Sequence, residues 1–211
     1  MKPLKLIIAL MASYSILFGQ PDAVTPKGIT IPGKAVATLR YSDSEGDHLM
    51  ILSSTGVYYD QYLSHDADGY LWNGGRESSL YATGFNQKDG ALLQNFRWEK
   101  HTLDCPYNIT TAFYPESLMS TDLDNDGKME VWIMYQAGCL SEDGPTELVL
   151  MLIRNSKSAQ TAHLMRGRTR VSLSNGTVAG GEFRFDAGFM KAPAPFRDHA
   201  IKMWAAALAA D

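Results

Sequence analysis

Four carboxylates alternate along the stretch DLDNDGKME, at a density that indicates metal chemistry. They belong to Asp122, Asp124, Asp126 and Glu130, which hold positions one, three, five and nine of the stretch. Gly127 at position six permits the left-handed turn that closes such a loop, and Lys128 at position seven can offer its main-chain carbonyl oxygen. Hard oxygen ligands in this number suit Ca²⁺ better than Mg²⁺ or Zn²⁺. The stretch therefore predicts a calcium site with Lys128 and the four acidic residues as ligands.

Electrostatic repulsion makes the same stretch costly without a cation. Two carboxylates at contact repel by about 1 kcal/mol in bulk water, and by more where solvent is excluded. We therefore expect the acidic loop, defined here as residues 122–130, to hold Ca²⁺. A solvated acidic turn that keeps neighbouring strand edges soluble is the alternative.

The residues around the acidic loop indicate a β-hairpin rather than an EF-hand. An EF-hand has a helix on each side and a bidentate glutamate at position twelve. Position twelve is Ile133, inside the alternating run VWIMY, and the segment SLMS before the loop also resembles a strand. The loop resembles the calcium loops of FG-GAP and VCBS-type repeats, which lie between neighbouring strands. Two other acidic turns, YSDSEGDHL and SHDADGYLW, lack ligands at positions one and nine, so we expect plain turns or degenerate copies there.

The first 19 residues have the features of a secretory signal peptide. Lys2 and Lys5 precede a mostly apolar stretch from Leu6 to Phe18, which is followed by the small residue Gly19. The stretch is shorter than the roughly 20 residues of a spanning helix. We expect cleavage after Gly19, export, and a mature chain without a transmembrane segment. A buried N-terminal helix is the alternative.

The charge balance narrows the class of partner. Loss of Lys2 and Lys5 would leave 17 basic and 23 acidic residues, a net charge of −6 compared with −4 for the whole chain. An acidic surface without a basic stripe argues against nucleic acid and against anionic lipid. A surface glycan or an envelope protein is the partner class that we retain.

The chain has two cysteines, Cys105 and Cys139, and both follow the predicted signal peptide. Exported proteins fold in an oxidising environment, which favours a disulfide between them. In the chain-entropy model, a loop of this size contributes roughly 3–4 kcal/mol to stability. Two free thiols are the alternative.

Short apolar runs separated by turns indicate a mainly β fold. β-Branched and aromatic residues are frequent, and SEGD, QKDG, DNDG and SNGT supply hairpin turns. We expect antiparallel hairpins in a sandwich or a partial propeller, with an extended segment at 20–33 and a single domain at 34–211. The predicted strands are Lys34–Tyr41, His48–Ser54, Gly56–Leu63, Ser79–Phe85, Leu92–Lys100, Ile109–Tyr114, Glu130–Gln136, Glu147–Arg154, Thr161–Gly167, Thr169–Ser174 and Gly181–Asp186.

The C-terminus changes from strand to helix periodicity. An alanine-rich segment follows Pro195, which fits the first turn of a helix. We expect a helix over residues 194–210 that packs one face on the sheet; a membrane-surface helix is the alternative. The residues of this face are Phe196, Ala200, Met203, Trp204, Ala207 and Leu208.

The order of these features resembles a small exported bacterial family. The signal peptide, YSDSEGDHLMILSSTG, LDC, TDLDNDGKMEVWIMYQAGC, ELVLMLI and FRDHAIKMW carry the resemblance, which spans most of the mature chain. Members of the family are mostly uncharacterised, and some carry the label surface polysaccharide biosynthesis protein. The resemblance implies a shared fold, the Cys105–Cys139 pairing and the metal loop. It implies no activity, because we connect no catalytic motif with that label.

Catalytic signatures are missing from the sequence. None of HExxH, GxSxG, CxxC, Walker or GxGxxG occurs. Glu99, His101 and Asp104 could form a carboxylate pair for glycan hydrolysis, although charged strand faces are commonplace.

We therefore expect an exported, non-catalytic β-rich module with a structural calcium loop, acting in the cell envelope. A carbohydrate-binding module with Trp72 and Trp98 as sugar platforms is the first alternative, and a glycan-processing enzyme is the second. Core packing is the usual role of a strand tryptophan, and we expect Trp132 and Trp204 to be buried.

Overall fold

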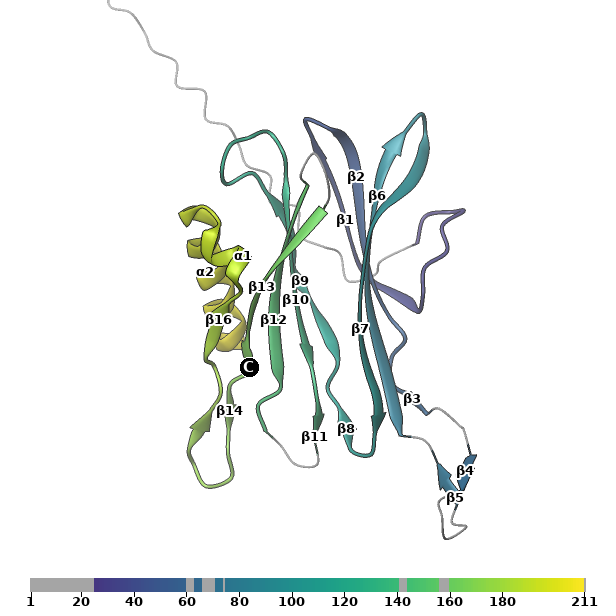
Figure 1. The fold of residues 1–211 in the computed structure, drawn as a ribbon, viewed down its shortest axis with the longest axis vertical. Helices are drawn as coiled ribbons and strands as arrows, with labels where there is room; N and C mark the ends of the chain where they lie inside the picture. Colours follow the sequence, from purple (N-terminus) through teal and green to yellow (C-terminus); the bar gives the residue numbers. More distant parts are fainter. Residues whose placement is uncertain are drawn as a thin grey trace, which may run out of the picture.

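The computed structural model describes residues 25–59, 63–65, 71–73, 75–140, 144–155 and 160–210. The predicted signal peptide at residues 1–19 lies outside the described residues. Two five-stranded antiparallel sheets form the body of the protein (Figure 1). The first sheet contains β1 (Lys34–Asp43), β2 (Gly46–Ser54), β3 (Tyr58–Tyr59), β6 (Arg76–Lys88) and β7 (Ala91–Cys105).

The second sheet has the strand order β16-β13-β12-β10-β9. Its strands are β9 (Ala112–Thr121), β10 (Glu130–Ala137), β12 (Glu147–Asn155), β13 (Gln160–Arg168) and β16 (Phe183–Phe185). Three short pairs lie outside the two sheets: β4 (Leu63–His65) with β5 (Leu71–Asn73), β8 (Asn108–Ile109) with β11 (Cys139–Leu140), and β14 (Val171–Ser172) with β15 (Val178–Ala179).

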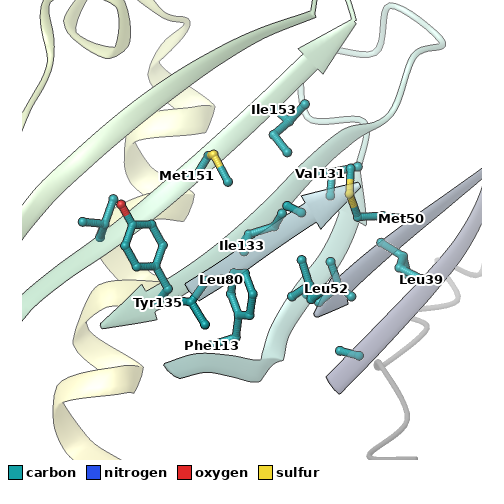
Figure 2. Packing of buried hydrophobic residues seen from close by; sticks show 14 of the residues in the cluster. Leu39, Met50, Leu52, Leu80, Phe113, Val131, Ile133, Tyr135, Met151 and Ile153 are labelled. Carbon is teal, nitrogen blue, oxygen red and sulfur yellow. The ribbon is translucent and has the colours of Figure 1, made fainter. Parts of the chain in front are cut away.

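The two sheets pack face to face as a sandwich. Met50 and Leu52 of β2 meet Ile133 and Tyr135 of β10 in one buried cluster, which Figure 2 shows from close by. Interdigitation of two inner sheet faces is the usual way that such sheets exclude water. The prediction of a mainly antiparallel β fold is confirmed, and of its two forms the structure has the sandwich.

Helices cover the other face of the second sheet as a third layer (Figure 1). They are α1 (Ala187–Lys191) and α2 (Ala194–Ala210). Trp132 and Met134 of β10 pack against Phe196 and Trp204 of α2. Because β10 is covered on both faces, its sequence is a continuous apolar run rather than a strict alternation.

The predicted helix at 194–210 and its buried face are confirmed, as is the burial of Trp132 and Trp204. Sequence analysis did not predict α1. Its N-cap is Asp186, which accepts a hydrogen bond from Phe189 N at 2.6 Å and another from Leu164 N of β13 at 2.8 Å. Among the described residues, no helix is long and apolar enough to cross a membrane.

Several strand limits differ from those predicted. β6 and β7 are longer than expected and form one long hairpin, whose turn places Asp89 and Gly90 at φ 51° and 79°. The predicted strand Gly56–Leu63 is wrong in extent: the described residues there contain β3 and the first residue of β4. Only β14 forms within the predicted strand Thr169–Ser174, because that short hairpin pairs with β15 alone.

The N-terminal segment before β1 covers part of the first sheet's outer face. Ile29 and Ile31 pack against Leu49, Ile51 and Phe85. This apolar contact explains why these three strand residues are buried although they face away from the sandwich core.

Replacement of Trp204 by alanine should lower the free energy of unfolding by about 3–5 kcal/mol, because a large buried side chain leaves a cavity between α2 and the second sheet. Urea denaturation measures the change. Ile201→Ala is the matched control on the exposed side of α2, where Ile201 is 43 % exposed, and we expect a change within about 0.5 kcal/mol. Similar losses for both variants would contradict the packing described here.

Candidate metal centre

The acidic loop connects β9 to β10 at the tip of a hairpin. Thr121 and Glu130 are opposite each other in the antiparallel register, so the loop begins and ends on paired residues. This is the hairpin position that the sequence predicted, with a strand on each side.

The four carboxylates of the loop converge. Each of Asp122, Asp124, Asp126 and Glu130 offers one oxygen, and these four atoms lie within 4.8 Å of one another. Residues separated along the chain meet because Asn125 and Gly127 take left-handed backbone conformations, with φ 56° and 78°. The group can hold a metal ion, and its donors are all hard oxygens.

Asp122 organises the turn of the loop. Its Oδ1 accepts a hydrogen bond from Asp126 N, and its Oδ2 accepts one from Gly127 N, both at 3.1 Å. Asp126 Oδ1 in turn accepts from Lys128 N at 2.8 Å. These bonds hold the backbone in a ring around the carboxylates.

Glu130 is the buried member of the group, with 2 % of its surface exposed. Its Oε2 accepts hydrogen bonds from Leu123 N and Thr121 Oγ1, both at 3.0 Å. Burial raises the pKa of the Glu130 carboxyl to about 7, and the hydrogen bonds from Leu123 and Thr121 only partly oppose this. A cation beside Glu130 would favour its ionised form.

Asp124 has one oxygen paired and one unpaired. Arg154 Nη2 of β12 donates to Asp124 Oδ2 at 2.6 Å, and the Arg154 guanidinium lies over the Phe196 ring at 4.6 Å. Asp124 Oδ1 is buried and has no hydrogen-bond partner. A buried acceptor without a partner is costly, so this oxygen is the one best placed to take a cation.

The residues present therefore fit a hard cation. A cavity of about 10 Å³ lies beside the cluster, and this volume is about the minimum that holds one water molecule. It is lined by Asp126, Lys128, Met129, Glu130 and Arg154. Arg154 contributes one positive charge against four carboxylates. The side chain of Lys128 forms an ion pair with Glu45, and the predicted role of its carbonyl oxygen as a ligand stays a prediction.

The turn between β1 and β2 packs directly on the acidic loop. Ser44 N donates to Gly127 O at 2.9 Å, and Met129 N donates to Asp43 Oδ2 at 3.2 Å. The ion pair between Glu45 and Lys128 completes the contact. This turn is the YSDSEGDHL segment that the sequence suggested as a plain turn or a degenerate copy, and the structure shows that it supports the loop from the other sheet.

Asp43 is held in place by its own partners. Its side chain is buried, and its Oδ1 accepts from His48 Nε2 at 2.8 Å and from Glu45 N at 2.7 Å. Burial alone would raise the pKa of the Asp43 carboxyl, but the hydrogen bonds from His48, Glu45 N and Met129 N lower it below its usual value. Asp43 is therefore a fixed anion that points its second oxygen at the acidic loop.

The disulfide lies at the opposite end of β10 from the acidic loop. Cys105 at the end of β7 is bonded to Cys139 of β11, as predicted. Because β7 belongs to the first sheet and Cys139 follows β10 of the second, the bond ties the two sheets together covalently.

The tryptophans proposed as sugar platforms are placed differently. Trp98 packs on the sandwich core, with its ring centroid 4.8 Å from that of Tyr135 and 6.3 Å from that of Phe113. Trp98 is therefore not an exposed sugar platform, because its side chain lies on the face of β7 that packs against the sandwich core. The backbone of Trp72 lies in β5, and its side chain lies outside the described residues.

The residues considered for glycan hydrolysis all lie on β7. Glu99 pairs with Arg97 at 3.1 Å and with His101 at 3.7 Å, and the other ring nitrogen of His101 lies 2.8 Å from Ser79 Oγ. Asp104 follows near the end of β7 in a left-handed conformation with φ 49°. Glu99 and His101 are exposed and have cross-strand or same-strand partners, an arrangement typical of a charged sheet face.

Sequence analysis missed Arg154 and Asp43. Arg154 reaches the loop because β12 pairs with β10 and places Ile153 opposite Val131. Asp43 reaches it because the two sheets stack. Neither contact leaves a local signal in the sequence, although the acidic turn around Asp43 was a visible feature. No protein-family model matches the chain, and neither a curated protein nor a solved structure matches it.

Without calcium, stability should fall as the pH rises. The raised pKa of Glu130 means that the folded protein favours the protonated carboxyl, so this contribution is complete below the ordinary value of 4.5 and is lost as the pH rises through about 7. The loss should approach about 3 kcal/mol, measured by urea denaturation in a chelator between these limits.

Glu130→Gln keeps the neutral shape and should remove most of this pH dependence. The matched control is Glu116→Gln, because Glu116 is an exposed carboxylate of β9 outside the acidic loop. A pH profile that stays the same in Glu130→Gln would contradict the buried, neutral carboxyl.

Proposed function

We propose that the chain is an exported, non-catalytic module of the cell envelope whose acidic loop holds a structural Ca²⁺ ion. The observation that carries the proposal is the buried, unpartnered Oδ1 of Asp124 among four converging carboxylates. A hard cation would give this oxygen a partner and would let Glu130 ionise in its buried position.

The donor set supports calcium over other metals. The cluster contains carboxylates and no histidine or cysteine, which zinc would favour. Irregular spacing of the carboxylates suits the six to eight oxygen contacts of Ca²⁺ better than the strict octahedron of Mg²⁺. Lys128 would add its main-chain carbonyl oxygen, and Arg154 would hold Asp124 in the orientation that presents Oδ1.

A structural role follows from what the acidic loop touches. Gly127 O and Met129 N bond to the β1–β2 turn of the first sheet, while the loop itself belongs to the second sheet. A cation that fixes the loop would therefore also fix the contact between the sheets at this end. In this role the cation would stabilise the contact between the sheets and would take part in no reaction.

Export is supported by the disulfide. A bond between Cys105 and Cys139 persists in an oxidising environment, and the basic and apolar start of the chain suits secretion. An envelope protein or a surface glycan would be the partner in that compartment.

Saturating calcium should raise the melting temperature by about 5–10 °C. A ligand at about 100 times its dissociation constant stabilises by about 2.7 kcal/mol, and each kcal/mol corresponds to about 2–4 °C for a chain of this size. Scanning calorimetry with calcium, with magnesium and with a chelator measures the shift, and magnesium should have the smaller effect.

Asp122→Asn should abolish most of the calcium shift, because it removes a ligand charge and keeps a hydrogen-bond acceptor for the loop backbone. Glu116→Gln is again the control and should keep the shift. An unchanged melting temperature of the native protein on chelation would remove the calcium proposal.

Asp43→Ala should weaken calcium binding by about tenfold although Asp43 is not a ligand, because outer-shell partners orient the ligands. Isothermal titration with calcium measures the affinity. Asp47→Ala is the matched control in the same turn, where Asp47 bonds only to Ser42 Oγ among the described residues. Asp43→Asn keeps an acceptor and should lose less affinity, and equal affinities in all these proteins would contradict the supporting role.

A further inference from the structure

A large cavity lies at the disulfide end of the second sheet, at the opposite end of β10 from the acidic loop. Its volume is about 610 Å³, within the roughly 300–1,000 Å³ of small-molecule sites. The end of β10, the segments that flank β12 and β13, the β14–β15 hairpin and the end of α2 surround it. The lining includes Thr110, Gln136, Thr146, Thr169, Arg170 and Ser172.

The lining of this cleft contains hydroxyl groups that a network of backbone hydrogen bonds holds in place. Thr146 and Thr169 are buried and bonded to each other, with Thr146 N donating to Thr169 Oγ1 at 2.9 Å and Thr169 N donating to Thr146 O at 2.9 Å. Gly138 makes room for this frame, because a Cβ there would lie 2.6 Å from Thr146 Cγ2 and 2.8 Å from Thr110 Oγ1. The polar groups are therefore positioned before any ligand arrives.

Two of these polar groups keep unused hydrogen-bonding capacity. Thr110 Oγ1 is buried and has no hydrogen-bond partner. Gln136 Oε1 accepts from Tyr114 at 3.2 Å, which leaves the amide nitrogen of Gln136 as a donor without a partner among the described residues. A buried polar atom without a partner is costly, and a ligand hydroxyl would offset that cost.

The charge of the cleft is positive although the protein is acidic. Arg170 lines the cleft, is exposed, and has no ion-pair partner in the described part of the chain. It ends the run RGRTR, whose other two arginines pair with Glu147 and Glu182. Arg170 is thus the free guanidinium of this run, and a planar guanidinium pairs well with a carboxylate or a phosphate.

We propose that this cleft binds a sugar that carries a negatively charged group. Arg170 pairs with the acidic group, and Thr110, Gln136 and Ser172 bond to the hydroxyls. Val171, Val178 and Leu208 line the same cleft and offer apolar contact to the C–H face of the ring. The site needs no cation and no tryptophan, so it stands apart from the acidic loop.

The test is a titration of the purified, isotope-labelled protein followed by NMR, with glucuronic acid, glucose 6-phosphate and glucose as probes. Resonances of residues around the cleft should shift with the acidic probes, which should bind at least about tenfold more tightly than glucose. Binding of glucuronic acid alone, or of the phosphate alone, identifies the kind of acidic sugar.

Arg170→Gln should reduce the affinity for the acidic probes to that for glucose. Arg40→Gln is the matched control, because Arg40 is an exposed arginine of β1 that does not line the cleft. Thr110→Val should weaken the binding of all three probes, because it removes a hydroxyl that bonds to the sugar. The melting temperature should stay the same or rise, because the lost hydroxyl is buried and has no partner.

Three results would overturn the proposal. They are the absence of shifts with all probes up to about 50 mM, equal binding of glucose and the acidic sugars, or equal losses in Arg170→Gln and Arg40→Gln. The calcium proposal is tested separately, because chelation should change the melting temperature whether or not the cleft binds a sugar.

Discussion

The free-energy cost of crowding and burying negative charge determines the structure around the acidic loop. Asp122, Asp124, Asp126 and Glu130 converge where two strands meet, and only Arg154 opposes them with a direct ion pair among the described residues. Hydrogen bonds offset part of this electrostatic cost. Backbone N–H groups donate to Asp122 and Glu130, and the Arg154 guanidinium donates to Asp124. The unpartnered Oδ1 of Asp124 is the part of the cost that the protein atoms leave unmet.

The site and the core are joined through β10. Trp132 is fully buried under α2, yet its indole nitrogen donates to Thr121 Oγ1 at 2.8 Å, and Thr121 donates to Glu130. Arg154 makes a second connection, from Asp124 to the Phe196 ring. A change in the packing of α2 would therefore reach the carboxylates within two contacts. The sheets supply rigidity, and the loop draws its geometry from them.

Sequence patterns predicted the features that depend on residues close together in the chain. The acidic hairpin, the helix at 194–210 with its buried face and the mainly β class follow from periodicity and turn residues, and the Cys105–Cys139 bond follows from the two cysteines of a chain expected to be exported. The choice between a sandwich and a partial propeller stayed open in the sequence. Contacts between sheets could not be predicted in this way, because strand order and stacking bring Asp43 and Arg154 to the loop from distant segments. The inward direction of Trp98 depends on the same stacking. The short helix α1 was missed because a single capped turn is too brief for a periodic pattern.

The disulfide and the proposed calcium site, at the two ends of β10, depend on different chemical conditions. The disulfide at one end depends on oxidising conditions, and the proposed cation at the other depends on free calcium. A reducing interior poor in calcium would leave both ends of the sandwich unsecured, so the nascent chain would stay pliable while it is being translocated. Under the export and calcium binding proposed above, transfer to an oxidising compartment that contains calcium would secure the two ends independently of each other.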